Sequence, residues 1–252
     1  MRLPGKRAIV TGAGAGLGAA IATRFAAEGA RVAVLDIDED AAGRVAGEIQ
    51  AAGGEALAAR VDIADDASVA AAFGAVTAAW DGIDVLVNNA GIAQRPGPAI
   101  DIAAEEIDRI LAVNVRGIFH TTRHALAALV DSRGTIINLA SNAALRPRPG
   151  MAWYNASKGA IVNLTFSLAA EYAAQKVRVN AIAPAFADTP MKSFILGEDP
   201  GAQIEQAVLA TIPLGRLCTG EDIAAAAVFL ASDEAAFVTG VVLPVDGGRM
   251  VA

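Results

Sequence analysis

The chain has 252 residues, of which 54% are hydrophobic and 19% charged, so it is long enough to bury one sizeable core. Its net charge of −7, without any run of basic residues, argues against nucleic acid and anionic membranes as partners. A single cysteine excludes an internal disulfide framework, and no apolar run approaches the ~18 residues of a membrane span. The N-terminus has no segment typical of a signal peptide. We therefore expect a soluble cytoplasmic protein.

Short apolar runs alternate with stretches of helical spacing along the chain. Strands are predicted where apolar runs end in glycine, asparagine or aspartate, and helices where apolar residues recur every three or four positions. The predicted strands are 8–10, 31–35, 56–61, 84–88, 135–140, 177–183 and 241–245. The predicted helices are 17–28, 38–52, 65–80, 103–130, 153–174 and 221–230. This alternation is typical of an α/β fold, here a single doubly wound Rossmann-type domain with a central parallel sheet of about seven strands and helices on both faces.

The segment 185–215 departs from that alternation. Short apolar clusters in and around it are separated by Pro184, Pro190, Pro200 and Pro213. A long insertion of this kind is usually functional, so we expect a lid over a substrate. Because no internal repeat, low-complexity segment or second domain is visible, residues 1–252 are predicted to form one domain.

A glycine-rich turn lies between the first predicted strand and the first predicted helix. It places Gly12, Gly16 and Gly18 in the order Gly-x-x-x-Gly-x-Gly. Glycines at such a turn let the backbone approach a pyrophosphate, and the helix N-terminus supplies N–H groups for the phosphates. Glycine-rich loops alone are weak signals, but the strand before this turn and the helix after it favour a dinucleotide site.

Asp36 ends the second predicted strand, 24 residues after Gly12 (36 − 12). A carboxylate near that spacing accepts hydrogen bonds from the ribose hydroxyls of NAD and repels the 2′-phosphate of NADP. No arginine or lysine lies between Gly12 and Gly18, or at Ile37, to pair with such a phosphate. The sequence therefore favours NAD over NADP as the cofactor.

Polar residues also follow the third and fourth predicted strands. Asp62 and Ile63 follow the third strand, where a carboxylate can accept a hydrogen bond from an adenine amino group; a plain loop aspartate is the other interpretation. Asn88 to Gly91, read Asn-Asn-Ala-Gly, follow the fourth strand and can tie loops together along the adenosine path. Asn114 lies inside a predicted helix, where asparagine is a mediocre helix former, so we expect a local kink or a water-relay role.

Tyr154 and Lys158 stand four residues apart in the predicted helix 153–174. At that spacing two side chains share one helix face, with Cβ atoms roughly 5–6 Å apart. An ammonium beside a phenol favours the phenolate and lowers the pKa of the tyrosine, which suits a general acid or base for an alcohol and its ketone. Ser141, just after strand 135–140, can donate a hydrogen bond to the same oxygen. The Tyr-x-x-x-Lys spacing is weak alone and gains weight from the dinucleotide motifs.

In this order and spacing, the motifs resemble the classical short-chain dehydrogenase/reductase family over essentially the whole chain. The shared motifs are TGAGAGLG at 11–18, Asp62, NNAG at 88–91, Asn114, Ser141, YNASK at 154–158 and VDGG at 245–248. The resemblance implies that Tyr154 is the catalytic acid/base and that Ser141 orients the substrate oxygen. It also implies that Lys158 lowers the pKa of Tyr154 and binds the nicotinamide ribose, and that Asn114 holds a water in a proton relay.

The same resemblance extends the expected cofactor contacts and predicts the assembly. Thr189 matches the threonine that contacts the nicotinamide carboxamide. The cofactor contacts expected in all are Gly12, Gly16, Leu17, Gly18, Asp36, Ile37, Asp62, Ile63, Asn89, Ala90, Gly91, Tyr154, Lys158, Pro184, Thr189 and Met191. The family usually forms homotetramers and sometimes dimers, so we expect a homo-oligomer with a tetramer favoured. Ala185 departs from the glycine usual in the family, and its Cβ is tolerated only if φ is negative.

We predict an NAD(H)-dependent oxidoreductase that transfers hydride between the cofactor and a small-molecule secondary alcohol or ketone. The alternative is a 3-oxoacyl-(acyl-carrier-protein) reductase-type enzyme using NAD(P)H. That subgroup usually carries two arginines, and this chain has Arg133 at the first position but Ala170 at the second. The favoured substrate is instead a sugar, polyol, cyclic or steroid-like alcohol. A non-catalytic NAD-binding regulator stays open, but it has no need of Ser141, Tyr154 and Lys158 together.

Two other pairs of side chains are expected to have no catalytic part. His120 and His124 have a spacing that suits a shared metal, but no third ligand is evident nearby, so we expect no metal and a helix face or subunit contact. Arg146 and Arg148 lie close to Tyr154 and would suit an anionic substrate, but we expect solvated loop arginines.

Overall fold

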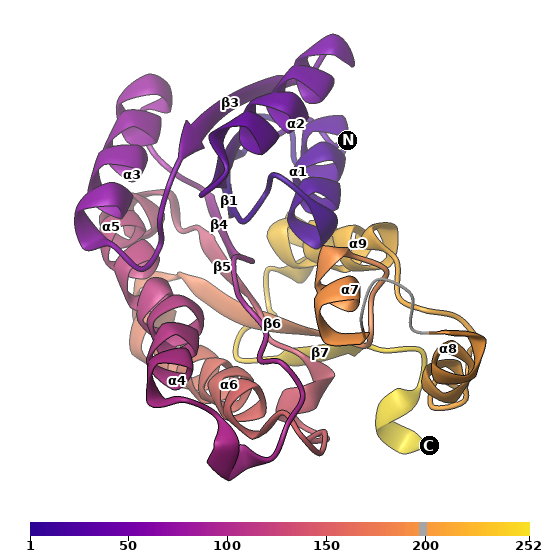
Figure 1. Cartoon of the computed structure of the whole chain (residues 1–252). Helices are drawn as coiled ribbons and strands as arrows, with labels where there is room; N and C mark the ends of the chain where they lie inside the picture. The colour runs from indigo at the N-terminus through magenta and orange to yellow at the C-terminus, as the bar shows by residue number, and fades with distance from the viewer. Residues whose placement is uncertain (197–200) are drawn as a thin grey trace.

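The computed structural model describes residues 1–196 and 201–252 of the chain. Its strands are β1 (Arg7–Thr11), β2 (Arg31–Asp36), β3 (Glu55–Arg60), β4 (Val85–Asn88), β5 (Thr135–Leu139), β6 (Arg178–Pro184) and β7 (Val242–Val245). These strands form one parallel sheet in the order β3-β2-β1-β4-β5-β6-β7 (Figure 1). The chain winds outward from β1 to β3 and then crosses back to β4 beside β1, which is the arrangement of a doubly wound fold.

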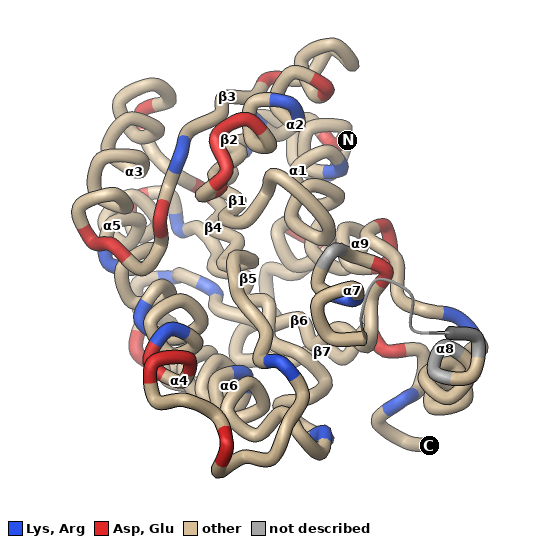
Figure 2. The backbone as a smooth tube through the Cα atoms, in the orientation of Figure 1, with Lys and Arg blue, Asp and Glu red and all other residues tan. Residues whose placement is uncertain are grey.

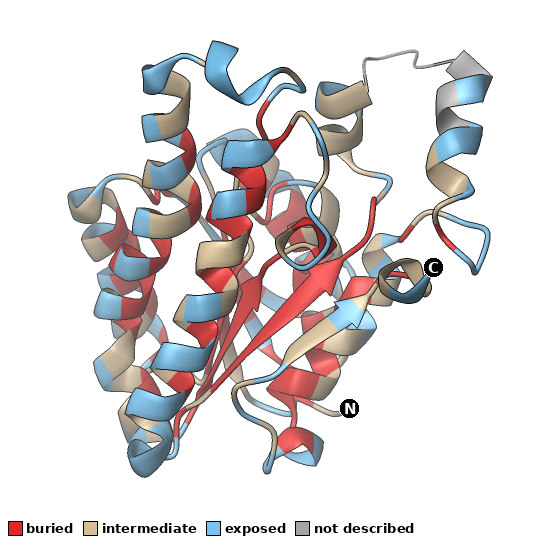
Figure 3. Cartoon of the chain, turned by 90° about the horizontal axis from the view of Figure 1, so that it is seen from below, coloured by how far each residue is buried: buried red, intermediate tan, exposed pale blue. Residues whose placement is uncertain are grey.

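Helices cover both faces of this sheet. They are α1 (Gly16–Ala27), α2 (Glu39–Ala51), α3 (Asp66–Trp80), α4 (Ala104–Leu111), α5 (Gly117–Ser132), α6 (Ala152–Tyr172), α7 (Pro190–Leu196), α8 (Gly201–Leu209) and α9 (Gly220–Ala231). Buried residues of α1, α2 and α9 pack on one face, and those of α3, α5 and α6 pack on the other. Figure 3 shows the central strands buried between the helices. No helix in the described part of the chain has both the length and the apolar character needed to cross a bilayer.

β2 illustrates why the sequence selects this arrangement. Val32 and Val34 belong to the core shared with α1, α2 and α9, whereas Ala33 and Leu35 belong to the core on the opposite face. Successive side chains of a strand face opposite sides, so a strand that is apolar at successive positions must be covered on both. The predicted α/β fold with a parallel sheet between two helical layers is confirmed.

The helix predicted over 103–130 is present, but it contains a π-helical turn. α4 ends at Leu111, a π-helical segment follows over Ala112–Arg116, and α5 begins at Gly117. The π-helical segment contains Asn114, whose buried amide bonds to the loop after β4 and to α6. Turns of this kind are frequent at functional sites. The local irregularity expected at Asn114 is therefore present as a wide helical turn.

The segment 185–215 contains more helix than its prolines suggest. α7 begins at Pro190 and α8 covers Gly201–Leu209, while residues 197–200 of the predicted lid lie outside the described residues. Proline is compatible with the first position of a helix because its missing N–H needs no partner there. A proline that the sequence presents as a breaker thus marks the beginning of α7.

Candidate active site

A cavity of about 640 Å³ lies at the carboxyl ends of the strands, where the sheet order reverses between β1 and β4. Ligands of doubly wound sheets bind in the crevice at this position. Most of the predicted site residues line it: Gly12, Gly16, Leu17, Asp36, Ile37, Asp62, Ile63, Asn89, Ala90, Gly91, Ser141, Tyr154, Lys158, Pro184, Thr189 and Met191. Two of the predicted residues, Gly18 and Asn114, do not line this cavity. The fold therefore gathers motifs from almost the whole chain at one edge of the sheet.

The turn between β1 and α1 needs its glycines for two different reasons. Gly12 and Gly16 have φ of +62° and +57°, in the left-handed region that favours glycine. Gly18 instead leaves room for a neighbour, because a Cβ there would overlap the carbonyl oxygen of Gly12 and the side-chain amide of Asn89. That amide donates to the carbonyls of Thr11 and Gly12, at 2.9 Å each, and holds the loop after β4 against the turn. The shape of the cavity thus depends on a glycine that does not line it.

Replacing Gly18 with alanine should therefore lower the free energy of unfolding by about 1–3 kcal/mol, the usual cost of forcing an extra carbon into a packed site. Gly43 provides the matched control, since it lies on an exposed face of α2 and a Cβ there meets nothing within 4 Å. Gly43→Ala should raise stability by about 0.5–1 kcal/mol. Urea unfolding of the parent and both variants measures these differences. Equal stability of Gly18→Ala and the parent would contradict the close approach at Gly18.

Two carboxylates lie on the cavity wall and are held by backbone donors. Asp36 accepts hydrogen bonds from the N–H groups of Gly14 at 2.8 Å and Asp38 at 3.1 Å. Asp62 accepts from the N–H of Ala64 at 2.9 Å. Figure 2 shows acidic residues gathered in the connection from β2 to α2, which begins at Asp36. These contacts fix both carboxylates and concentrate negative charge at this part of the wall.

Tyr154 and Lys158 lie on α6, whose first turn is held by a residue distant in sequence. Gln94 is fully buried, and its side-chain oxygen accepts from the N–H groups of Trp153 at 3.0 Å and Tyr154 at 3.2 Å. A helix leaves such N–H groups unpaired at its beginning, and the side chain of Met151 makes no capping hydrogen bond to them. Gln94 therefore fixes the start of α6 and, with it, the position of Tyr154.

Burial dominates the protonation of Tyr154 and Lys158. Burial raises the pKa of Tyr154, although a hydrogen bond with Ser141 and the charge of Arg148 act in the opposite direction. Burial also lowers the pKa of Lys158 to about 8. The Lys158 ammonium donates to the carbonyl of Leu139 at 2.8 Å and lies 5.9 Å from the centroid of the Tyr154 ring. The expected net lowering of the Tyr154 pKa is corrected, because burial outweighs the hydrogen bond with Ser141 and the charge of Arg148. The contribution of Lys158 stays a prediction.

The side-chain amide of Asn114 forms hydrogen bonds with other groups of the protein. Its oxygen accepts from the N–H of Ile92 at 2.8 Å, and its nitrogen donates to the Ile92 carbonyl at 2.9 Å and the Ser157 hydroxyl at 3.0 Å. These bonds join the loop after β4 to α6. They also bring Gly91 close to the catalytic helix, since a Cβ on Gly91 would lie 3.4 Å from Lys158 Nζ. The geometry makes Asn114 a positioning residue, and its water-relay role stays a prediction.

Two curated relatives match the chain over nearly its whole length. 4-Formylbenzenesulfonate dehydrogenase of Comamonas testosteroni is 41% identical over 252 residues, which cover 100% of both chains. 2-(S)-hydroxypropyl-CoM dehydrogenase 3 of Xanthobacter autotrophicus is 44% identical over 249 residues, which cover 98% of this chain and 97% of that protein. Both relatives are dehydrogenases by name, and the likeness includes the segments that form the cavity.

A family model and a solved structure agree with the relatives. The crystal structure of 3-ketoacyl-(acyl-carrier-protein) reductase from Brucella melitensis complexed with NADH is 43% identical, with a TM-score of 0.92 over 99% of this chain and 100% of that one. The family model described as enoyl-(acyl carrier protein) reductase matches residues 12–249. The chain belongs to the short-chain dehydrogenase/reductase family. It is an oxidoreductase that acts on CH–OH groups.

In this short-chain dehydrogenase/reductase, two residues outside the recognised motifs contribute to the structure of the site. Gln94 acquires its role only from the contact with α6. Arg148, expected to be solvated, is half-buried instead: its guanidinium lies 4.6 Å from the centroid of the Phe186 ring and lines the cavity. Arg146 is exposed, as expected. The one available sequence signal is the pair of prolines on either side of Arg148, which restrict the backbone there.

The departure from the family at Ala185 causes no backbone strain. In the described part of the chain, the residues other than glycine that have a positive φ are Asp81, Arg133 and Lys176. Ala185 therefore meets the condition under which a Cβ is tolerated. Its N–H donates to the carbonyl of Val245 at 3.2 Å, which connects β6 to β7 below the cavity.

The two histidines bond to separate partners. Nδ1 of His120 lies 3.0 Å from the carbonyl oxygen of Ile63, and Nε2 of His124 lies 2.9 Å from a carboxylate oxygen of Asp66. Within residues 1–196 and 201–252, no three His, Cys, Asp or Glu side chains are grouped as metal ligands. Each histidine thus connects α5 to the region around α3.

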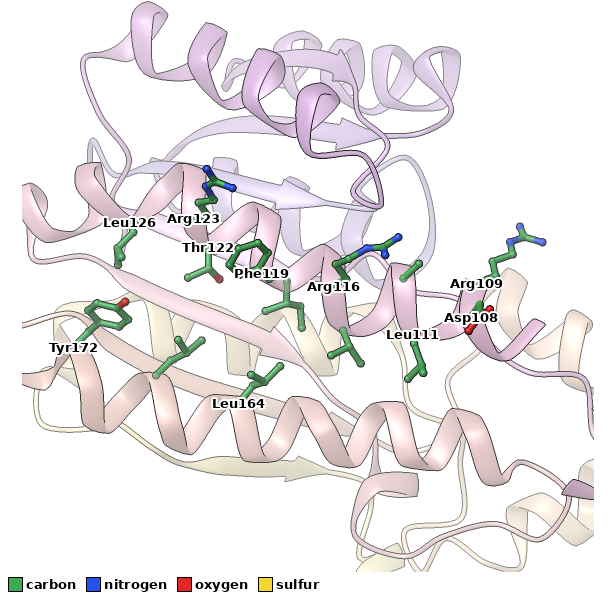
Figure 4. Close-up of a pocket in the computed structure, with 14 residues that line it drawn as sticks. Asp108, Arg109, Leu111, Arg116, Phe119, Thr122, Arg123, Leu126, Leu164 and Tyr172 are labelled. Carbon is green, nitrogen blue, oxygen red and sulfur yellow. The ribbon is translucent and has the colours of Figure 1, made fainter. Parts of the chain in front are cut away.

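A larger hollow, of about 1060 Å³, lies away from the catalytic candidates between α4, α5 and α6 (Figure 4). Apolar side chains such as Leu126 and Leu164 face it from α5 and α6, and Asp108 and Arg109 lie at its α4 end. Since Tyr154 and its partners do not line this hollow, size alone does not identify the reacting site of this enzyme.

Proposed function

We propose that this enzyme is an NAD(H)-dependent dehydrogenase that interconverts a secondary alcohol and a ketone. The observation that carries the proposal is the convergence of Ser141, Tyr154 and Lys158 on the cavity that begins at the glycine turn after β1. A buried phenol and ammonium beside the hydroxyl of Ser141 favour catalysis over binding alone, because burying ionisable groups is costly and such groups cluster at functional sites. The cavity also has the volume usual for small-molecule and cofactor sites.

The residues of the chain fit a dinucleotide. Gly12 and Gly16 have backbone conformations that only glycine adopts readily, and α1 begins at Gly16 with its free N–H groups at the cavity wall. Asp36 suits the ribose hydroxyls. Thr189 and Met191 line the same cavity and are assigned to the nicotinamide end. When bound, the nicotinamide supplies the hydride chemistry.

Side chains of the protein transfer the proton and hold the substrate oxygen in place. Tyr154 gives its proton to the oxygen in ketone reduction and takes it back in alcohol oxidation. Ser141 donates a hydrogen bond to the same oxygen and fixes it beside Tyr154. Because burial raises the pKa of Tyr154, its phenol is protonated at neutral pH and is ready to donate. Lys158 is assigned to the nicotinamide ribose, and Gln94 and Asn114 keep α6 in place.

The choice of NAD over NADP rests on charge. The carboxylate of Asp36 on the cavity wall repels a 2′-phosphate, and no arginine or lysine lies between Gly12 and Gly18 or at Ile37 to attract one. The homologous structure from Brucella melitensis was solved with NADH, which supports the same choice. The cofactor of this enzyme is therefore proposed to be NAD.

The segment 185–215 is proposed to be a lid on a single domain of residues 1–252. Met191 and Ile195 of α7 pack against the small buried cluster that contains Tyr154. An apolar cover at this place would exclude water from the reacting atoms, which is a common use of such segments. The lid therefore completes a closed environment around Tyr154.

The hollow between α4, α5 and α6 supports a homo-oligomer, for which we favour a tetramer. Leu111 of α4 and Phe119 of α5 both line this hollow and are exposed, and apolar surface of this kind usually marks a contact. A second copy of the chain is the proposed occupant. Phe119→Glu should lower the molar mass seen by sedimentation, whereas Ile100→Glu, at another exposed apolar residue, should leave it unchanged. An unchanged mass for Phe119→Glu would contradict this assignment.

Initial rates with purified protein test the proposed function. NADH formation from a panel of secondary alcohols is followed in parallel with NADPH formation from NADP. Turnover with NAD on one class of alcohol is the expected result. A 3-oxoacyl-(acyl-carrier-protein) reductase is the second candidate, favoured by the family model and the Brucella melitensis structure. Turnover confined to NADPH and 3-oxoacyl thioesters would select it, and NADH binding without any turnover would favour a regulator.

A further inference from the structure

Arg148 places an unpaired guanidinium in the wall of the catalytic cavity. The guanidinium is half-buried, stacks over the ring of Phe186 and faces the same cavity as Tyr154. In the described part of the chain, no carboxylate or carbonyl oxygen accepts a hydrogen bond from it. Arginine has five N–H donors, and those not covered by the ring are available to a ligand. A neutral alcohol in this cavity would leave the positive charge of Arg148 without a partner.

A second arginine increases the positive charge at this place. Burial, and after it the charge of Arg249 near the C-terminus, lowers the pKa of Arg148 to about 10. The Nη1 atom of Arg249 is buried and has no hydrogen-bond partner among the residues described. The nearby Asp246 carboxylate attracts Arg249 but accepts its hydrogen bonds from the backbone N–H groups of Gly248 at 3.0 Å and Met250 at 2.8 Å. Of the arginine pair, Arg148 and Arg249, it is Arg148 that has no carboxylate partner within residues 1–196 and 201–252.

A partly buried guanidinium such as that of Arg148 is costly without a matching anion, because it loses water and is repelled by Arg249. An anion at Arg148 would remove this cost and gain charge-assisted hydrogen bonds. The planar guanidinium suits carboxylate, sulfonate and phosphate groups in particular, since it can donate two parallel hydrogen bonds to their oxygens. Phe186 holds the plane of Arg148 in advance, so little side-chain entropy is lost on binding.

We propose that Arg148 binds an anionic group of the substrate, so that the enzyme acts on secondary alcohols or ketones that carry a carboxylate, sulfonate or phosphate. The proposal rests on the proposed function, because it places this group in the cavity of Tyr154. Arg249 does not line the cavity, but its charge adds to the positive electrostatic potential at Arg148. In a chain with a net charge of −7, such a local cationic site also directs an anionic substrate to one place.

Matched pairs of substrates test the proposal by kinetics. The probes are 3-hydroxybutanoate, 2-hydroxypropane-1-sulfonate and 2-hydroxypropyl phosphate, each against a neutral counterpart: methyl 3-hydroxybutanoate, 1-(methylsulfonyl)propan-2-ol and dimethyl 2-hydroxypropyl phosphate. The parent should prefer the anion of a pair by about 10–100-fold in kcat/KM, and Arg148→Gln should bring the two values of a pair together. The ratio within a pair isolates the contact with the anion, because both members share any effect of Arg148 on Tyr154. Arg148→Lys should restore part of the preference. The best of the three anions identifies the group. Equal preference in the parent and Arg148→Gln would overturn the proposal.

Anion binding without turnover gives an independent readout. Tm is measured at constant ionic strength while acetate, methanesulfonate or inorganic phosphate replaces chloride. At least one anion should raise the Tm of the parent by about 3 °C and have less effect on Arg148→Gln. Arg133→Gln is the control, since Arg133 is exposed after the end of α5 and does not line the cavity; it should behave as the parent. Equal shifts in the parent and Arg148→Gln overturn the proposal. If no alcohol is oxidised at all, the proposed function fails, and this titration still decides the role of Arg148.

Discussion

Replacing Tyr154 with phenylalanine should lower kcat for alcohol oxidation by about 10²–10⁴-fold, the usual contribution of a positioned general acid or base. The substitution deletes one oxygen and keeps the ring, which packs in a buried cluster with Ala143 and Met151. Folding and NADH binding should therefore change little, so the loss would lie in the chemical step. Initial rates together with NADH fluorescence titration separate the two effects.

Tyr172 provides the matched control because it is the other tyrosine of the chain and ends the same helix, α6. It does not line the catalytic cavity, and Tyr172→Phe should keep the parent rate. If Tyr154→Phe also kept the parent rate, the acid/base assignment would be wrong.

The pH dependence gives a second readout for Tyr154. Burial raises the pKa of its phenol, so the phenolate that accepts a proton in oxidation is scarce at neutral pH and becomes more abundant as pH rises toward that pKa. Oxidation by the parent should therefore accelerate at alkaline pH, whereas ketone reduction should keep its rate through neutral pH and slow only as the pH approaches the raised pKa. Tyr154→Phe should lose both trends. A reduction rate that rises with pH in the parent would contradict the role of the protonated phenol.

The parts of the site that the sequence predicts best are those whose physics is local. The glycines at 12 and 16 are required by the backbone of a single turn. Asp36 is the last residue of one strand, so its position at the edge of the sheet can be predicted from that strand alone. Tyr154 and Lys158 are placed by helical spacing alone. The fold class is equally local in origin, because apolar residues at successive positions of a strand require helices on both faces.

What the sequence does not predict depends on contacts between distant segments. The π-helical turn within helix 103–130 lies where Asn114 contacts Ile92 and Ser157, and no helix propensity encodes those contacts. The solvation of a loop arginine is equally non-local: Arg148 is half-buried because Phe186, after β6, lies beneath it. The direction of the Tyr154 pKa shift is also non-local in origin. Sequence spacing places Lys158 near Tyr154 but does not show that both side chains are buried, and burial determines the direction of the shift.

Replacing Asp36 with asparagine should shift the ratio of kcat/KM for NADP to that for NAD by about 10²–10³-fold in favour of NADP. Like charges placed together cost several kcal/mol, and each 1.36 kcal/mol corresponds to a factor of ten in rate. Asparagine removes the charge that repels the 2′-phosphate, and it weakens the hydrogen bonds from the NAD ribose. Its side-chain oxygen can still accept from the N–H of Gly14, so the glycine turn should keep its shape.

Asp38→Asn is the control that separates a local charge effect from a general one. Asp38 lies two residues further along, does not line the cavity, and caps α2 by accepting from the N–H of Ala41 at 3.0 Å. Asparagine also caps helices well, so this variant loses the same charge with little change in stability. It should keep the parent preference for NAD. If both variants shifted the ratio equally, the overall acidity of the connection from β2 to α2 would set the cofactor choice; if neither did, Asp36 would have no part in it.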